Sequence, residues 1–314
     1  MKTRAAILFG LATMLGAQTY VVDASNGPGT HFTTIAAAVA AVPDGAVLVV
    51  RAGTYAGFTV SGRGVSILAN AGVGITSQVV VTQTQPHQAV TLRALAWTTA
   101  WIPAGHCLVQ PTQCAGPVLI ENVTMPANAG CHTGYPYPGP CVQPVGIYAD
   151  HCAQIALRGC AISCTARFED CDTAIESCVI TGENSIPTMS GTYGRFALTV
   201  LRGHLQIAGP TIVRGGNGWP YGPGAAPPGV GVFMQDADLR VLDGQVHAGT
   251  GSNWAQPAIT TSFGGTLRVS PRVVLSSPAP TTVMPGLTGY SAAPGGTLGA
   301  TVTTEDGEIG RAHV

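Results

Sequence analysis

The sequence predicts an all-β solenoid, in which short strands stack turn upon turn along one axis. The first observation is an eight-residue pattern, clearest at residues 155–162, with two apolar positions separated by one residue, then a small or turn-forming residue, then another apolar position. The second is its return at residues 90–97, 118–125, 173–180, 205–212, 239–246 and 267–274, with a weaker copy at 65–69. A short strand that bends into a second strand has this pattern. Because one such unit cannot bury its apolar side alone, stacked copies would share one long core.

The composition agrees with a β-rich and turn-rich chain. Of 314 residues, 46% are hydrophobic and only 9% are charged, with 42 Gly and 23 Pro, so few segments carry the charge that long exposed helices need. The formal net charge is -1 and the single lysine is Lys2. Nucleic acid is excluded as a partner, because its binding needs clustered positive charge. We expect a monomer.

The N-terminus has the features of a secretory signal over residues 1–18. A basic start at residues 1–4 precedes an apolar run over residues 5–17 that ends in small residues. This run is shorter than the roughly 20 residues of a membrane-spanning helix, so a cleaved signal is predicted. We therefore expect a secreted or cell-surface protein without a membrane span.

A short helix should cap the first turn of the solenoid. After a strand at residues 20–23, Thr33 or Thr34 can cap a helix over residues 35–42, and its apolar positions fall on one side. Residues 46–50 then form a continuous apolar strand, predicted to be buried on both faces. Such a helix would cover the otherwise exposed end of the core.

A family resemblance becomes specific at this point. Residues 23–27, 32–35, 38–45 and 49–55 together resemble the opening of pectin methylesterases and of other secreted proteins of the pectin-lyase-like superfamily. The resemblance implies a right-handed parallel β-helix with three sheets and an N-terminal helical cap. We assign residues 19–277 to this domain.

The C-terminal residues depart from the repeat. Residues 278–307 begin as a Pro- and Ser-rich linker and then alternate like the first strand of a further β domain. Residues 308–314 match a sequencing adapter translated in frame and followed by a stop codon, so we expect a gene fragment and exclude them from the fold.

Nine cysteines in an exported chain predict disulfides. The pairs that we expect from proximity in the sequence or in neighbouring repeats are Cys107 with Cys114, Cys131 with Cys141, Cys152 with Cys171, and Cys160 with Cys178. This leaves Cys164 over. The alternative is a zinc site, but the cysteines include no CxxC pair, so no metal centre is predicted.

The superfamily resemblance implies paired carboxylates, an arginine and, in some members, Ca²⁺ on the outer face of one sheet. The densest charged group here comprises Asp150, Arg167, Glu169, Asp170 and Asp172, which are the candidate catalytic residues. Carboxylates on adjacent turns could hold Ca²⁺, or two of them could act as acid and base in glycoside hydrolysis. The alternative is that these residues occupy solvated turns.

Asp236 and Asp238 form a second candidate group, for substrate binding, beside an inserted loop that carries Trp219 and Tyr221. Sugar rings stack on exposed aromatic side chains, although the same residues could form a turn and anchor the loop. Further aromatic candidates in or beside loops are Trp97, Trp101, Tyr135, Tyr137 and Trp254. Six histidines, including His204, stand singly and predict no site.

Gln88 is a further candidate for substrate binding. It lies in a stretch, residues 88–93, that resembles the one whose glutamine stabilises the oxyanion in methylesterases. The other methylesterase signatures, which supply the nucleophilic aspartate, its partner and the arginine, are missing, so active methylesterase chemistry is not expected.

Two functions fit these observations. The first is a secreted β-helix protein that binds, and if an enzyme also processes, an extracellular polysaccharide such as a uronate-containing one, as a lyase or a glycoside hydrolase. The second is a non-catalytic structural or adhesive solenoid at the cell surface.

Overall fold

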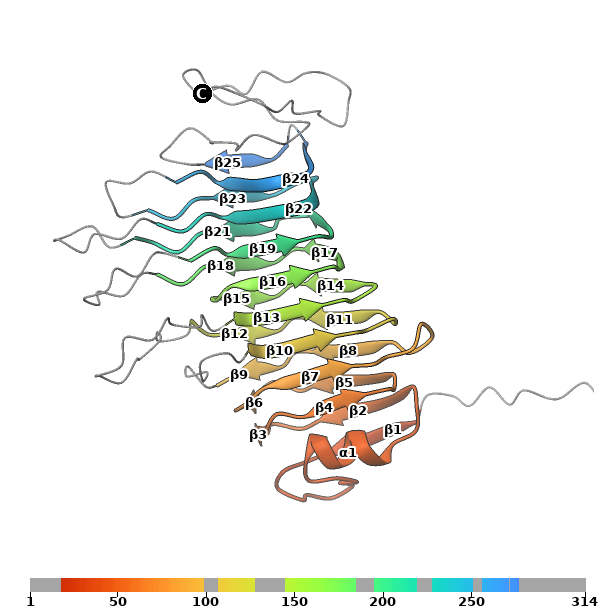
Figure 1. Ribbon diagram of the computed structural model, residues 1–314. Coiled ribbons are helices and arrows are strands. Elements are labelled where there is room, and N and C mark those ends of the chain that lie inside the picture. Colours follow the sequence, from red (N-terminus) through yellow and green to blue (C-terminus); the bar gives the residue numbers. More distant parts are fainter. Residues whose placement is uncertain are drawn as a thin grey trace, which may run out of the picture.

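The chain coils into a parallel β-helix, in which each turn adds one strand to each of three sheets (Figure 1). The computed structural model describes residues 18–98, 107–127, 145–184, 195–218, 228–250, 256–270 and 272–276. Within these residues, eight turns contribute to all three sheets and a ninth turn begins. The predicted fold class is confirmed, and the residues after 276 lie outside the described part.

The first sheet runs the length of the helix. Its strands are β2 (Ala46–Val50), β5 (Val65–Ala69), β8 (Val90–Arg93), β11 (Val118–Glu121), β14 (Ile155–Arg158), β17 (Asp172–Glu176), β20 (His204–Ala208), and the second halves of β22 (Val232–Val241) and β24 (Ile259–Val269). β1 (Thr19–Val22) pairs with β2 at the end of this sheet.

The second sheet follows the first after a sharp bend. Its strands are β3 (Gly53–Tyr55), β6 (Val73–Ile75), β9 (Ala96–Trp97), β12 (Thr124–Met125), β15 (Ala161–Ile162), β18 (Val179–Thr181), β21 (Ile212–Arg214), β23 (Gln245–His247) and β25 (Val274–Ser276). The predicted eight-residue pattern thus corresponds to one first-sheet strand, the bend and one second-sheet strand.

The third sheet closes each turn. Its strands are β4 (Thr59–Ser61), β7 (Val79–Thr82), β10 (Cys107–Thr112), β13 (Val145–Asp150), β16 (Ala166–Glu169), β19 (Leu198–Leu201), and the first halves of β22 and β24. β22 passes from the third sheet to the first through an irregularity between Gln235 and Ala237, so these two sheets are continuous there.

Inward side chains at the same position of successive turns form the core. Leu92, Ile120, Leu157 and Ile175 occupy one such column in β8, β11, β14 and β17, and each is at most 1% exposed. Burying each side chain contributes about 1.5–3 kcal/mol. The outward positions alternate with these, and therefore β2 is buried only on its inner face, contrary to the prediction.

The predicted helical cap is confirmed. Helix α1 (Ile35–Ala41) begins at Thr34, whose side chain accepts a hydrogen bond from the Ala37 N–H at 3.2 Å. The buried face of α1 packs against β1 and β4 at the N-terminal end of the β-helix, where it covers the first turn (Figure 1). None of the described helices has the length and apolar character needed to cross a membrane.

Two corners of most turns use a residue in the left-handed conformation. At the first-to-second corner these are Ala94, Asn122, Gly159, Ser177 and Gly209, which is the small or turn-forming position of the repeat. At the third-to-first corner they are Gly62, Gln83, Gln113, His151, Asp170, Arg202 and Asp236, with φ between +48° and +60°. Asn, Asp and Gly tolerate this conformation better than most residues, and here backbone bonds between turns hold the larger ones in it.

The seven described cysteines are free and buried. The predicted pair of Cys107 and Cys114 is wrong, because Cys107 begins the extended strand β10 and Cys114 lies two residues after its end. Cys152 lies beside Cys171, and Cys160 lies beside Cys178, with backbone N to Sγ distances of 3.4 Å in both pairs, but no bond joins them. Cys131 and Cys141 lie outside the described residues.

Candidate functional site

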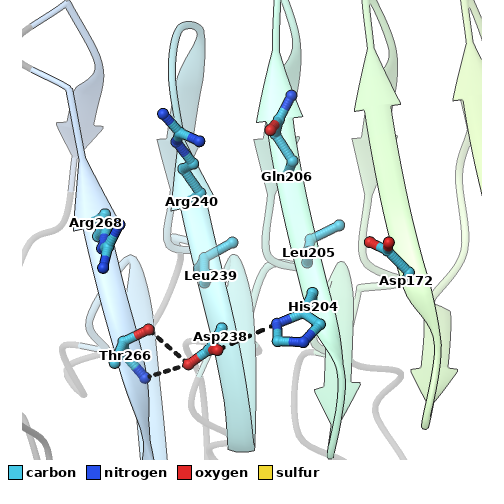
Figure 2. A pocket seen from close by; sticks show the side chains of 9 residues that line it. All are labelled: Asp172, His204, Leu205, Gln206, Asp238, Leu239, Arg240, Thr266 and Arg268. Carbon is cyan, nitrogen blue, oxygen red and sulfur yellow. Dashed lines mark hydrogen bonds and ion pairs between the residues drawn. The ribbon is translucent and has the colours of Figure 1, made fainter. Parts of the chain in front are cut away.

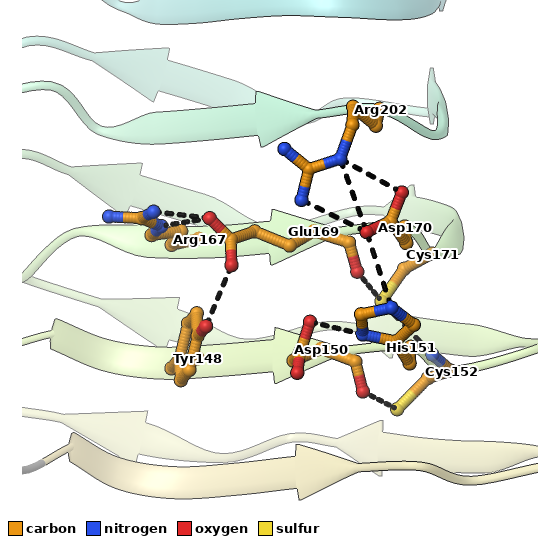
Figure 3. A network of polar contacts seen from close by, with 9 residues as sticks. All are labelled: Tyr148, Asp150, His151, Cys152, Arg167, Glu169, Asp170, Cys171 and Arg202. Atoms are coloured by element: carbon orange, nitrogen blue, oxygen red, sulfur yellow. Dashed lines mark hydrogen bonds and ion pairs between the residues drawn. The ribbon is translucent and has the colours of Figure 1, made fainter.

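Four of the five predicted catalytic residues meet at the third-to-first corner. The corner cluster, as we call it, consists of Tyr148, Asp150, His151, Arg167, Glu169, Asp170 and Arg202 (Figure 3). Strands β13 and β16 pair in register, which sets Tyr148 beside Arg167 and Asp150 beside Glu169. The left-handed corner residues His151, Asp170 and Arg202 follow on three successive turns and project outward.

Glu169 is held by two neighbours. Arg167 donates from Nε to Oε1 at 3.2 Å and also from Nη2, while the Tyr148 hydroxyl donates to Oε2 at 2.7 Å. The Arg167 guanidinium also lies 5.6 Å from the centre of the Tyr148 ring. Burial raises the pKa of Glu169, but the hydrogen bonds from Arg167 and Tyr148 outweigh it, and the pKa lies below its usual value.

The remaining residues form a chain of polar contacts. His151 Nδ1 lies 2.6 Å from Asp150 Oδ1, and His151 Nε2 lies 3.6 Å from Asp170 Oδ2. Arg202 contacts both oxygens of Asp170, with an Nη2 to Oδ2 distance of 3.0 Å. The hydrogen bond to Asp170 raises the pKa of Arg202, so this side chain stays charged.

These contacts do not fit a calcium site. Ca²⁺ takes six to eight oxygen ligands, whereas arginines already occupy the carboxylates of Glu169 and Asp170. Asp150, His151 and Asp170 do have ligand atoms within 4.8 Å of one another, but Arg202 would have to leave Asp170 before an ion could bind there. The corner cluster therefore fits a network of paired charges better than a metal centre.

Replacing Glu169 with glutamine should lower the free energy of unfolding at pH 7 by about 1–3 kcal/mol, because the charged hydrogen bonds from Arg167 and Tyr148 are weakened. The folded-state pKa of Glu169 is depressed, so its stabilising effect is complete above the unfolded value of about 4.3 and is lost as the pH falls through the folded pKa. Urea unfolding at pH values from 7 to 2 measures the difference between the variant and the wild type. This difference should shrink in acid.

Glu176→Gln is the control for this experiment. Glu176 forms an ion pair with Arg158 at 3.2 Å, but both side chains are more than half exposed, so its loss should cost less than about 1 kcal/mol at every pH. Equal effects of the two substitutions would contradict the role of the buried contacts around Glu169.

A second candidate surface lies around the corner, on the outer face of the first sheet. The first-sheet groove, as we call it, has a volume of about 250 Å³ and crosses β17, β20, β22 and β24 (Figure 2). Its lining residues are Asp172, His204, Leu205, Gln206, Asp238, Leu239, Arg240, Thr266 and Arg268. The predicted residues Asp172 and Asp238 therefore line the same groove, on either side of His204.

One column of the groove is a chain of hydrogen bonds. Asp238 Oδ2 lies 3.1 Å from His204 Nδ1, and Asp238 Oδ1 accepts hydrogen bonds from the Thr266 N–H at 3.0 Å and from the Thr266 hydroxyl at 2.5 Å. Asp172 pairs in register with His204 on the other side. Asp238 is thereby held in one orientation by both neighbouring turns (Figure 2).

The other column carries two arginines. Gln206, Arg240 and Arg268 pair in register on three successive turns, and all three are exposed. Neighbouring strands are about 4.8 Å apart, so the backbones that carry the two guanidinium groups are separated by this distance along the axis of the β-helix. These residues and His204 were not predicted from the sequence, although residues 205–207, 239–241 and 267–269, aligned as copies of one strand, place Gln206, Arg240 and Arg268 together.

The other predicted binding residues lie elsewhere or outside the described part. Gln88 is 8% exposed and sits in the loop before β8, where its Nε2 donates to the Gly62 carbonyl at 3.0 Å and its Oε1 accepts from the Gln85 N–H at 2.8 Å. Both polar atoms of the Gln88 side chain are thus hydrogen-bonded to the backbone. Asp236 is exposed at the third-to-first corner, as its interpretation as a turn residue expects.

The aromatic candidates contribute nothing to either surface within the described residues. Trp97 is 3% exposed in β9 and donates from Nε1 to the Ser77 carbonyl at 3.1 Å, so it belongs to the core and not to a sugar platform. Outside the described residues lie Trp101, Tyr135, Tyr137, Trp219, Tyr221 and Trp254.

Comparison with known proteins adds two solved structures. The sequence matches no protein-family model and no curated protein. A crystal structure of a pectin methylesterase mutant in complex with hexasaccharide IV is 11% identical, with a TM-score of 0.43. A crystal structure of pectin methylesterase in complex with hexasaccharide VII is 13% identical, with a TM-score of 0.35. Both similarities cover 77% of this chain and 82% of the other.

Proposed function

We propose that the protein binds an acidic, uronate-containing polysaccharide along the first-sheet groove. The observation that carries this proposal is the pair of exposed arginines, Arg240 and Arg268, in register on adjacent turns. A planar guanidinium binds a carboxylate through two parallel hydrogen bonds, which makes arginine well suited to carboxylate recognition. Two such groups at a regular spacing fit an extended polymer that carries a carboxylate on its sugar units.

The side chains of the opposite column can form hydrogen bonds with the hydroxyl groups of the same ligand. Asp172 and Asp238 offer carboxylate acceptors, and His204, Gln206 and Thr266 add further polar groups. A uronate presents both kinds of partner, because each ring has a carboxylate and several hydroxyls. The separation of acidic and basic side chains into two columns therefore matches the two sides of such a chain.

The corner cluster favours binding without cleavage. General acid catalysis needs a group that holds a proton near the working pH, whereas Glu169 has a depressed pKa and Asp170 is paired with Arg202. This observation supports the second candidate function, a non-catalytic structural or adhesive solenoid. The leader-like residues 1–18 support an extracellular location for either function.

The test compares a uronate oligosaccharide with a neutral oligosaccharide of the same length by isothermal titration calorimetry. We expect saturable binding of the uronate that weakens with added salt, and no binding of the neutral sugar. Absorbance of unsaturated products, release of reducing ends and release of methanol are followed in parallel, with and without Ca²⁺. Equal affinity for both sugars, or none for either, would show that the arginine pair does not define the ligand.

A further inference from the structure

Five of the seven described cysteines directly follow a left-handed corner residue. At the third-to-first corner, Cys114, Cys152 and Cys171 follow Gln113, His151 and Asp170, and their side chains point inward on three successive turns. Each thiol donates to the carbonyl oxygen two residues before it, at 3.5 Å for Cys114, 3.4 Å for Cys152 and 3.0 Å for Cys171. The three thiols therefore have the same geometry, and Figure 3 shows it for Cys152 and Cys171.

Cys152 touches both of its neighbours in this column. Its N–H lies 3.4 Å from Cys171 Sγ, and its Sγ lies within hydrogen-bond reach of the Sγ of Cys114, which the register of β10 and β13 sets beside it. The column ends on both sides, because Thr84 takes the same position one turn before Cys114 and Gly203 takes it one turn after Cys171. Neighbouring turns are about 4.8 Å apart, within the range of Cα separations that a disulfide spans, whereas two turns are too far.

A different pair lies at the first-to-second corner. Cys160 and Cys178 follow Gly159 and Ser177, and the Cys160 N–H lies 3.4 Å from Cys178 Sγ. The equivalent residues on the turns before them are Val123 and Leu95, and Pro210 and Thr211 take this place on the turn after. The column therefore holds one pair of thiols and no third.

We propose that Cys152 is a disulfide site shared by two partners, so that the oxidised protein contains a Cys114–Cys152 isomer and a Cys152–Cys171 isomer that interconvert by exchange. Stacking places the three sulfurs roughly in line along the axis, and thiol–disulfide exchange proceeds by in-line attack. Cys160 and Cys178 form a single, unshared bond. The proposal is independent of polysaccharide binding.

The chemistry balances with a small-molecule disulfide, such as oxidised glutathione, as the oxidant. The Cys114 thiolate attacks glutathione disulfide and releases one glutathione. Cys152 then attacks the Cys114 sulfur of the mixed disulfide and releases the second, so two cysteine thiols are oxidised and one disulfide is reduced. For exchange, Cys171 attacks the Cys152 sulfur, the Cys114–Cys152 bond breaks, and the proton from Cys171 passes to Cys114 without an oxidant.

The environment of the thiols determines when they can be oxidised. Because all three side chains are buried, oxidation should accompany folding, before the turns close over the sulfurs.

The experiment refolds the full chain in a glutathione redox buffer, quenches with acid, alkylates the free thiols and maps disulfides by mass spectrometry. We expect both Cys152 isomers, together with Cys160–Cys178. Alkylated Cys152 in the refolded protein, a single isomer, or a Cys114–Cys171 bond would overturn the proposal.

Two serine variants and a control sharpen the result. Cys114→Ser should leave only Cys152–Cys171, and Cys171→Ser should leave only Cys114–Cys152; a hydroxyl already fits this column at Thr84. Cys164→Ser is the control, because Cys164 is buried away from both columns and its loss should change neither isomer. Should a variant fail to fold, the wild-type map still decides the question.

Discussion

Leu157→Ala is expected to lower the free energy of unfolding by about 3 kcal/mol, because it opens a cavity in the middle of the core. Leu157 is fully buried, and its column continues with Ile120 on the turn before and Ile175 on the turn after. Hydrogen bonds on both sides hold β14 in register, so the neighbouring turns cannot move in to fill the space. Urea denaturation followed by circular dichroism measures the loss.

The matched control is Leu119→Ala. Leu119 lies in β11, on the turn next to Leu157, but its side chain is on the outer face and only partly buried. Removing it should cost less than about 1 kcal/mol, since solvent replaces the lost atoms. If both substitutions cost the same, the assignment of inner and outer faces would be wrong.

Arg268→Ala should weaken binding of the uronate oligosaccharide about tenfold, and the double substitution with Arg240→Ala about a hundredfold, because each lost charged hydrogen bond costs roughly 1.5–3 kcal/mol. Arg268→Lys should retain part of the affinity, since it keeps the charge but not the planar fork. Calorimetric titration of each variant provides the affinities.

The control is Arg158→Ala. Arg158 is an exposed arginine on the same face of the same sheet, but it pairs with Glu176 outside the groove. Its loss should leave the affinity unchanged. A similar weakening in Arg268→Ala and Arg158→Ala would indicate a diffuse effect of net charge instead of a defined site.

The first two sheets could be predicted from the sequence because a fixed distance links them. A two-residue bend joins β14 to β15, so both strands and the small corner residue Gly159 fall within one eight-residue window. The helix could be predicted for a similar local reason, since Thr34 caps it directly.

The third sheet could not be predicted in the same way. Its strands also alternate, as Ala166 and Phe168 in β16 show, but their distance from the second sheet varies from turn to turn. A pattern that recurs at irregular intervals does not align with the other two. The wrong pairing of Cys107 with Cys114 has this origin, because the strand β10 between them was not expected.

The groove was hidden for a different reason. Asp238 belongs to a site because it contacts His204 and Thr266, and these residues become its neighbours only after the turns have stacked in register. His204 had no partner within a few residues in the sequence, and a site of this kind emerges only from the pairing of whole turns. The acidic residues, in contrast, could be found by their density along the chain.

The register between turns also bears on how such a protein can change over evolutionary time. Each turn is positioned by hydrogen bonds to its neighbours, so the amount of chain in a turn matters little: Leu157 to Ile175 takes 18 residues (175 − 157), whereas Ile120 to Leu157 takes 37 (157 − 120). Segments can therefore be lengthened or exchanged where a turn leaves its second-sheet strand, with the stacked interior left intact. New recognition surfaces can therefore arise in this fold through changes in the segments that follow the second-sheet strands.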